Sequence, residues 1–128
     1  MLRKYNPEGM TAPLSPYSHA CEVPPGARWL FIAGQIAIAE DGSIPAGVEA
    51  QTDMIYQNIG NILKSAGMGY QDLVWVNSFL GDIEDRVVFN KTRAKYHGDA
   101  KPVSASSFVK MLVKPELRVE IQAIAAKV

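Results

Sequence analysis

The sequence is poor in residues that bind metal ions or form disulfides. Its 128 residues include a single cysteine, Cys21, and two histidines, His19 and His97. One cysteine cannot form an internal disulfide, and the three residues do not have the spacing of a metal-ligand set. We therefore expect no metal centre, and we expect both histidines to be structural or surface residues.

The chain also lacks an excess of charge and long apolar runs. Thirteen basic and thirteen acidic residues give a formal net charge of zero. This balance argues against a nucleic-acid partner, because the broad positive surface of such proteins is missing. No apolar run approaches the roughly 18 residues that span a bilayer, and the N-terminus has no apolar signal-peptide core. We expect no membrane partner and a reducing, cytoplasmic location.

Strand-like and helix-like segments alternate along the chain without a linker or an internal repeat. Residues 48–66 place apolar side chains three or four positions apart, which predicts an amphipathic helix. Residues 72–80 are apolar on both sides, as expected for a strand covered on both faces. The predicted elements are strands at 18–23 and 29–39, a helix at 48–66, a strand at 72–80, a helix at 82–96, and strands at about 104–113 and 118–126.

This order predicts an α+β fold in which one mixed sheet carries two helices on one face. At this length we expect a single domain that comprises residues 1–128. The opposite face of the sheet then needs a cover, and another copy of the chain is the simplest one. The pattern therefore favours a homo-oligomer.

Two residues stand out within the predicted strands. Gly34 interrupts the strand at 29–39, where it indicates either a β-bulge or the close approach of another group to the backbone. Glu120 alternates with apolar residues, so that it shares one side of the last strand with Arg118 and Gln122. That side is either open to solvent or a subunit contact. In a contact, the partly desolvated carboxylate would be a candidate to activate a water molecule.

Five stretches occur in an order that is typical of one known family: APLSPYSHA (12–20), FIAGQIAI (31–38), QTDMIYQNIGNILKSAGM (51–68), FN (89–90) and VEIQAIA (119–125). Together they resemble the RidA family, also called the YjgF or reactive intermediate deaminase family. The resemblance implies a chorismate-mutase-like α+β sandwich that assembles as a homotrimer, with small-molecule clefts at the subunit interfaces. Many members hydrolyse enamines or imines, such as 2-aminoacrylate, to a keto acid and ammonia, and they need no cofactor.

The resemblance also assigns roles to individual residues. Glu120 corresponds to the glutamate that positions the attacking water, and Tyr17 to the tyrosine of the cleft; these two are the expected catalytic residues. A carboxylate can take a proton from water, and a phenol can orient or protonate the imine nitrogen. Gly34, Asn90 and Ser104 correspond to substrate-binding positions.

The sequence departs from the family pattern at the rim of the cleft. Active deaminases of the family usually have Pro-x-Arg there, and the arginine clamps the substrate carboxylate with two charge-assisted hydrogen bonds. This chain has serine in place of that arginine, in the segment Pro102-Val103-Ser104. A serine hydroxyl donates one neutral hydrogen bond and cannot balance a buried negative charge. Arg93 or Arg118 is an alternative source of the missing charge.

Three functions are compatible with these observations. We favour a cofactor-free enamine or imine hydrolase that acts on small metabolites, with a specificity altered by Ser104. The alternative is a non-catalytic, trimeric small-molecule-binding or regulatory protein. A role directed at nucleic acid is the third, and the neutral charge argues against it.

Overall fold

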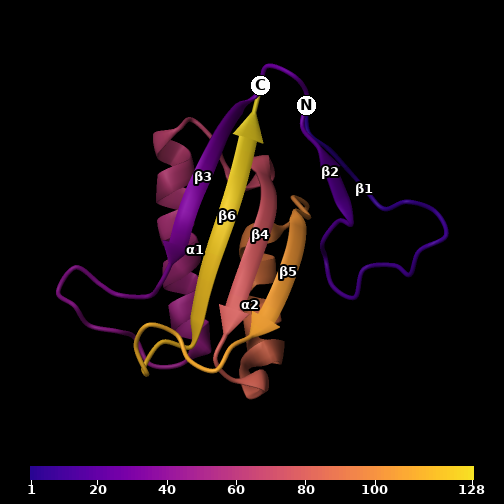
Figure 1. Cartoon of the computed structure of the whole chain (residues 1–128). Helices are drawn as coiled ribbons and strands as arrows, with labels where there is room; N and C mark the ends of the chain where they lie inside the picture. Colours follow the sequence, from indigo (N-terminus) through magenta and orange to yellow (C-terminus); the bar gives the residue numbers. More distant parts are fainter.

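The computed structural model describes the whole chain, residues 1–128. Figure 1 shows a four-stranded sheet with two helices, and a separate pair of short strands near the N-terminus. None of the helices has the length and apolar character that crossing a membrane requires. The elements are β1 (Arg3–Tyr5), β2 (Ala20–Glu22), β3 (Arg28–Gln35), α1 (Val48–Ser65), the 3-10 turn η1 (Tyr70–Asp72), β4 (Leu73–Leu80), the 3-10 turn η2 (Ile83–Asp85), α2 (Arg86–His97), β5 (Val103–Phe108) and β6 (Val119–Lys127).

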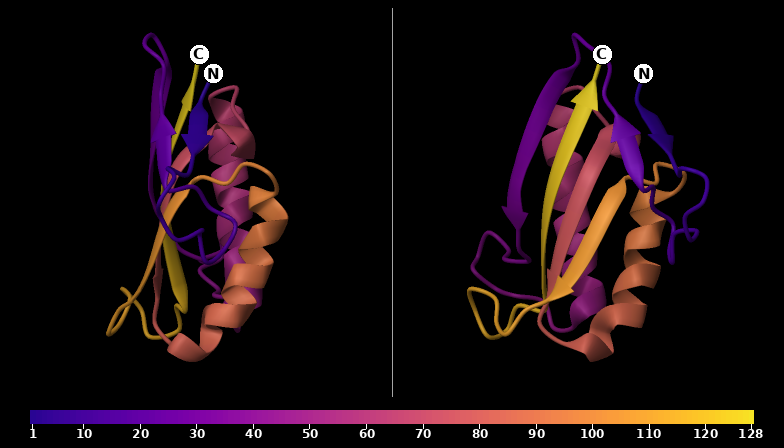
Figure 2. Two further views of the ribbon diagram at one scale, coloured as in Figure 1. Left: turned by 90° about the vertical axis from the view of Figure 1, so that its right-hand side faces the viewer. Right: turned by 45° about the vertical axis from the view of Figure 1, so that its right-hand side comes forward.

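The main sheet is mixed and has the strand order β3-β6-β4-β5. β6 is antiparallel to both of its neighbours, whereas β5 runs parallel to β4. Seen from the side, α1 and α2 lie on the same face of this sheet, and no helix covers the other face (Figure 2). The predicted α+β architecture, one mixed sheet with two helices on one face, is confirmed.

The helix-covered face of the sheet contains the hydrophobic core. α1 contributes Ile55, Ile59 and Leu63, which are fully buried and share one cluster with Val76 of β4 and Ile121 of β6. Burying a side chain of this size contributes roughly 1.5–3 kcal/mol. The apolar residues that are three or four positions apart therefore face the sheet, as predicted, and they pack α1 against the central strands.

The alternation along β6 separates the two faces of the sheet. Val119 and Ile121 are fully buried, whereas Glu120 and Gln122 are partly exposed. Successive side chains of a strand point to opposite faces, so the partly exposed pair lies on the face that no helix covers. The predicted division of this strand into a polar and an apolar side is confirmed.

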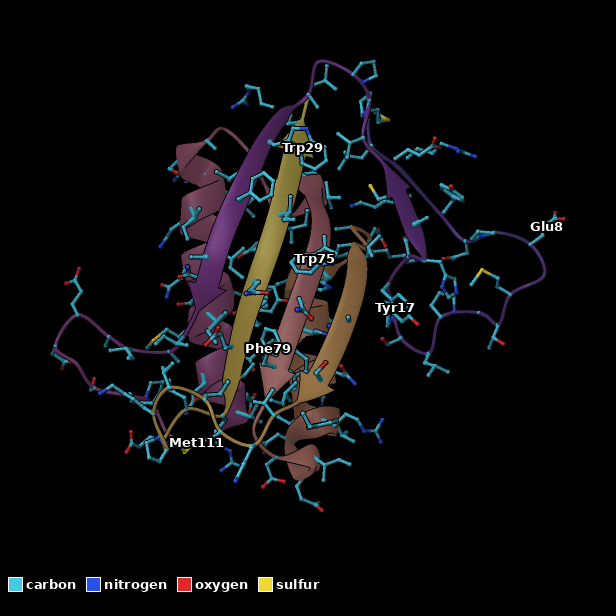
Figure 3. The ribbon with its side chains drawn as sticks, viewed as in Figure 1. Glu8, Tyr17, Trp29, Trp75, Phe79 and Met111 are labelled. Carbon is cyan, nitrogen blue, oxygen red and sulfur yellow. The ribbon has the colours of Figure 1, made fainter.

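The uncovered face carries aromatic side chains as well as polar ones. Trp29 and Phe31 of β3 are 52% and 73% exposed, and their rings are stacked with centroids 6.3 Å apart. Trp75 and Phe79 of β4 are partly exposed on the same face, and Figure 3 shows both in front of the sheet together with Trp29. Large apolar groups gathered on one exposed face of a globular domain are typical of an interaction surface.

Two strands are shorter in the structure than the sequence pattern predicts. The strand expected at 104–113 ends at Phe108, because Phe108 pairs with Leu80, the last residue of β4, and later residues have no partner strand. The strand expected at 29–39 ends at Gln35, the last residue of β3 that pairs with β6. Apolar composition continues in both segments, but pairing with a neighbouring strand does not.

Two other boundaries differ at the ends of elements. The helix expected at 82–96 begins as the turn η2, in which the Asp82 carboxylate accepts a hydrogen bond from the Glu84 amide at 2.9 Å. The strand β1 was not predicted, because it has three residues and carries the charged Arg3 and Lys4. It pairs with β2, where Arg3 forms an ion pair with Glu22.

The C-terminal end of α2 packs against α1 through a buried histidine. His97 is 4% exposed, and its Nε2 lies 2.7 Å from the hydroxyl oxygen of Tyr56. Burial lowers the pKa of His97 to about 3, and the positive charges of Arg93 and Lys4 act in the same direction. Burial raises the pKa of Tyr56. His97 is therefore a neutral structural residue.

We predict that His97 makes the fold less stable in acid. Its folded pKa lies below the value of about 6.5 expected in the unfolded chain, so the unfolded state binds the additional proton. Its contribution is complete above about pH 6.5 and is lost progressively as the pH falls toward 3. At pH 5 the free energy of unfolding should be about 2 kcal/mol lower than at pH 7, measured by urea unfolding at one protein concentration.

The substitution His97→Gln should remove most of this pH dependence, because glutamine does not titrate. His19→Gln is the matched control, since His19 lies in the segment before β2, outside the core, where its Nε2 donates to the Thr11 carbonyl. It should retain the wild-type slope. An unchanged slope in His97→Gln would contradict the prediction.

Candidate functional site

A cavity of about 400 Å³ lies between α2, β5 and the segment that precedes β2. Polar side chains from all three elements line it. Asn90 and Arg93 come from α2, Ser104 from β5, and Tyr17 from the segment before β2. Phe89 supplies an apolar wall. A concave site with a few converging polar groups on an apolar wall is typical of small-molecule binding.

Backbone pairing with β5 brings Tyr17 to this cavity. Ser18 forms a parallel bridge with Val103, and its amide donates to the Pro102 carbonyl at 3.2 Å. The Ser18 hydroxyl also donates to the Lys101 carbonyl at 2.7 Å. The backbone and the side chain of Ser18 thus tie the N-terminal segment to the start of β5. In Figure 3 the Tyr17 side chain lies beside the edge of β5 that faces away from the rest of the sheet.

The two arginines that could supply a displaced positive charge lie in different places. Arg93 lines the cavity, and its Nη1 donates to Ser104 Oγ at 3.0 Å. Arg118 lies elsewhere and binds the Asp85 carboxylate with two hydrogen bonds of 2.8 and 2.9 Å. Arg118 also forms a longer ion pair, 3.7 Å, with Asp82. The cavity therefore contains one of the two alternative cations, and Arg118 is engaged by carboxylates.

Arg93 is buried although it forms no salt bridge. Its residue surface is 7% exposed, and no Asp or Glu is paired with its guanidinium. Burial lowers the pKa of the Arg93 guanidinium, an effect that the nearby Tyr56 opposes. The guanidinium carbon lies 5.0 Å from the ring centroid of Phe89, which is a cation–π geometry.

Gly34 and Glu120 lie together outside this cavity. A side chain at position 34 would overlap Glu120 Oε2, so the carboxylate occupies the space beside the glycine backbone. The pairing of β3 with β6 also shifts register between Ile32 and Gln35. Both features expected of Gly34 are therefore present, a bulge and a close approach. The absence of a side chain at Gly34, and not its backbone angles, lets the Glu120 carboxylate lie there.

The five predicted site residues thus form two groups within the chain. Tyr17, Asn90 and Ser104 line the cavity beside β5, whereas Gly34 and Glu120 lie on the uncovered face of β3 and β6. β4 separates β5 from β6 in the sheet, so one chain does not bring the two groups together.

One further pattern in the sequence points to the cavity, although it is not part of the family motifs. Asn90 and Arg93 are three residues apart on a predicted helix, and residues at this spacing share a helix face. A residue expected to bind substrate and a neighbouring cation on the same face indicate a polar site. Ser106 of β5 also lines the cavity and has the same parity along the strand as Ser104.

A second cavity, of about 690 Å³, lies near both chain termini. It contains none of the predicted site residues. Lys4 is partly buried beside it, and its Nζ donates to the carbonyls of Ala100 at 2.6 Å and Gln71 at 3.3 Å. Because none of the predicted site residues lies here, the smaller cavity beside β5 is the better candidate. No group of three or more His, Cys, Asp or Glu side chains in the chain could hold a metal ion.

Related sequences are similar over nearly the whole chain. A RutC family protein of Pyrococcus horikoshii is 38% identical over 122 residues, which are 94% of each chain. A Bos taurus protein named 2-iminobutanoate/2-iminopropanoate deaminase is 35% identical over 118 residues, which are 91% of this chain and 83% of the relative.

Solved structures show the same architecture. The Yersinia pestis protein YyfB, described as a protein of unknown function of the conserved Rid protein family, superposes with a TM-score of 0.85 at 32% identity over 98% of each chain. RidA from an Antarctic Psychrobacter has a TM-score of 0.72 at 27% identity, over 96% of this chain and 98% of its own. The fold is therefore the chorismate-mutase-like α+β fold that the motifs implied.

The family model described as Endoribonuclease L-PSP matches residues 9–127. This match covers all five motifs and every predicted site residue. The chain therefore belongs to the Endoribonuclease L-PSP family, which is the RidA or YjgF family that its motifs indicated.

Proposed function

We propose that this protein is a cofactor-free hydrolase that converts small enamines or imines to a carbonyl compound and ammonia. One observation carries the proposal: the cavity beside β5 gathers Tyr17, Asn90 and Ser104 in a chain whose Bos taurus relative is named as an imine deaminase. A cytoplasmic location belongs to the same proposal. Cys21 supports it, because this lone thiol has no disulfide partner.

The complete site, in this proposal, forms between the subunits of a homotrimer and binds its small-molecule ligand there. Glu120 is on the uncovered face and Tyr17 is beside β5, so a neighbouring copy is needed to bring a carboxylate to the cavity. The exposed rings of Trp29 and Phe31 support an interface on that face, because a contact would remove them from water.

The proposed reaction is the addition of water to a C=N carbon. Glu120 would accept a proton from the attacking water, which forms the new C–O bond, while the Tyr17 hydroxyl would orient or protonate the nitrogen. Collapse of the tetrahedral carbon then breaks the C–N bond and releases ammonia, and the C=O bond of the product forms. An enamine would first take a proton at carbon to become the imine. The overall balance is imine plus water to carbonyl plus ammonia, with no oxidant or reductant.

Ser104 would alter the specificity of this reaction. Deaminases of the family usually have an arginine at this position of β5, and serine places a short neutral hydroxyl there instead. The substrate then meets a smaller, uncharged group on the β5 side of the cavity. Tyr17 and Asn90 still line the cavity, so the hydrolytic chemistry is retained in the proposal.

We predict that Glu120→Gln lowers the rate of enamine hydrolysis by about 100-fold or more, because general bases contribute at least this much. The substrate is 2-aminoacrylate, generated by a serine dehydratase and followed by ammonia release, with a panel of larger and neutral imines run in parallel. Glu116→Gln is the matched control, since Glu116 is an exposed glutamate that precedes β6. It should retain the wild-type rate.

The hydrolase proposal fails if wild type hydrolyses none of the substrates, and the role of Glu120 fails if wild type and Glu120→Gln hydrolyse them at equal rates. If both are inactive throughout, the non-catalytic alternative remains, a trimeric small-molecule-binding or regulatory protein. If both are active, another group takes the proton from water.

For the assembly, we expect light scattering to give a particle of three times the 14.0 kDa chain mass at micromolar concentration. Phe31→Asp should shift the protein toward the monomer, because a carboxylate would replace a ring in the proposed contact. Val87→Asp on α2 is the matched control, since Val87 is 67% exposed compared with 73% for Phe31. A wild-type monomer, or equal effects of both substitutions, would contradict an interface on the uncovered face.

A further inference from the structure

The cavity beside β5 contains a buried cation without an anionic partner. The residue surface of Arg93 is 7% exposed. Within the chain, its guanidinium donates one hydrogen bond, to Ser104 Oγ at 3.0 Å. The contrast with Arg118 is direct, because that side chain is more exposed and yet has a bidentate carboxylate partner in Asp85. The protein therefore neutralises an arginine near its surface and leaves a buried one without a counter-charge.

Such an arrangement costs free energy in the unliganded protein. Buried charges are normally paired, since a neutral hydroxyl does not compensate the loss of hydration. The Phe89 ring at 5.0 Å offers a partial, cation–π compensation. Burial lowers the pKa of the Arg93 guanidinium, which is consistent with an uncompensated positive charge. Charged groups held in this way, in a concave site, are characteristic of ligand-binding positions.

The surroundings of Arg93 favour an anion and not a neutral ligand. Within one chain, none of the side chains that line the cavity is acidic. Hydroxyl and amide groups complete the polar part of the lining: Tyr17, Asn90, Ser104 and Ser106. A guanidinium fork beside hydroxyl donors matches the two oxygens of a carboxylate.

We propose that Arg93 is the specificity-determining residue of the cavity and binds the carboxylate of the substrate from the α2 side. This inference rests on the proposed function for the nature of the substrate, a 2-imino or 2-enamino acid. Ser104 is a positioning residue, because its Oγ accepts one guanidinium N–H and holds the fork toward the cavity. The charge that β5 lacks is thus supplied by the neighbouring helix, and the substrate is held in a different orientation from one clamped by an arginine on β5.

The test measures binding and does not depend on turnover. Pyruvate, a 2-oxo acid, and pyruvamide, its neutral counterpart of similar size, are titrated into the assembled protein by calorimetry or NMR. Wild type should bind pyruvate at least about tenfold more tightly than pyruvamide, as expected for a charge-assisted contact. Arg93→Gln should lose this preference while its affinity for pyruvamide stays within about threefold.

Arg86→Gln is the matched control, since Arg86 is an exposed arginine that lines the same cavity. It should keep the preference for pyruvate at low and at physiological salt. Equal losses in the two variants would overturn the inference, because they would indicate a general positive field and not a specific clamp. A wild type that binds pyruvamide as tightly as pyruvate would also overturn it, without reference to any variant.

Two further variants separate the clamp from a structural role. Arg93→Lys keeps the charge without the fork and should retain part of the preference for pyruvate. Ser104→Ala should weaken pyruvate binding with no change for pyruvamide, and Ser104→Thr should restore it.

Arg93→Gln should also unfold at or above the wild-type melting temperature, because it removes an unpaired buried charge. Pyruvate should raise the melting temperature of wild type and not that of Arg93→Gln. A lower melting temperature of Arg93→Gln, together with an unchanged preference for pyruvate in Arg93→Lys and Ser104→Ala, would mean that Arg93 stabilises the fold and does not bind the ligand. This outcome would overturn the inference.

This result and the hydrolase proposal can fail separately. An Arg93-dependent preference for pyruvate in a protein that hydrolyses no imine would overturn the reaction and support the anion site. Imine hydrolysis that depends on Glu120, by a protein without a preference for pyruvate over pyruvamide, would support the reaction and overturn the anion site.

Discussion

The structure depends on the burial of one face of β6 beneath α1. Ile121 and its buried neighbours on this strand have no exposure, and the apolar stripe of α1 covers them. Because the side chains of a strand alternate, fixing this face also fixes the opposite one. Glu120 is therefore directed to the face that no helix covers, beside the aromatic side chains of β3 and β4. The position of the candidate carboxylate is thus a consequence of core packing.

The cavity on the other side of β5 depends on a different contact. The segment before β2 is tied to the start of β5 by Ser18, and α2 packs alongside, so that Tyr17 and Asn90 reach one space. A short side chain at position 104 leaves the Arg93 guanidinium room to reach β5 and bond to the serine hydroxyl. A serine at this position of β5 therefore accommodates a cation from the helix.

The two arginines considered as replacements illustrate how local partners decide a role. Arg118 precedes β6 and meets Asp85 at the end of η2, where its charge is balanced within the chain. Arg93 meets a hydroxyl and an aromatic ring, neither of which carries a full negative charge. A balanced ion pair stabilises the connection between two elements, whereas an unbalanced buried cation is available to a ligand.

The sequence by itself determined the order of most elements, the amphipathic face of α1 and the two sides of β6, because these follow from local periodicity. Family motifs identified Glu120, Tyr17, Gly34, Asn90 and Ser104 as candidates. Strand ends at Gln35 and Phe108 were decided by tertiary structure, since a strand stops where its pairing partner stops. Tertiary structure also decided which group the Arg93 guanidinium contacts, because a position on a helix does not reveal which group of another element a long side chain will meet.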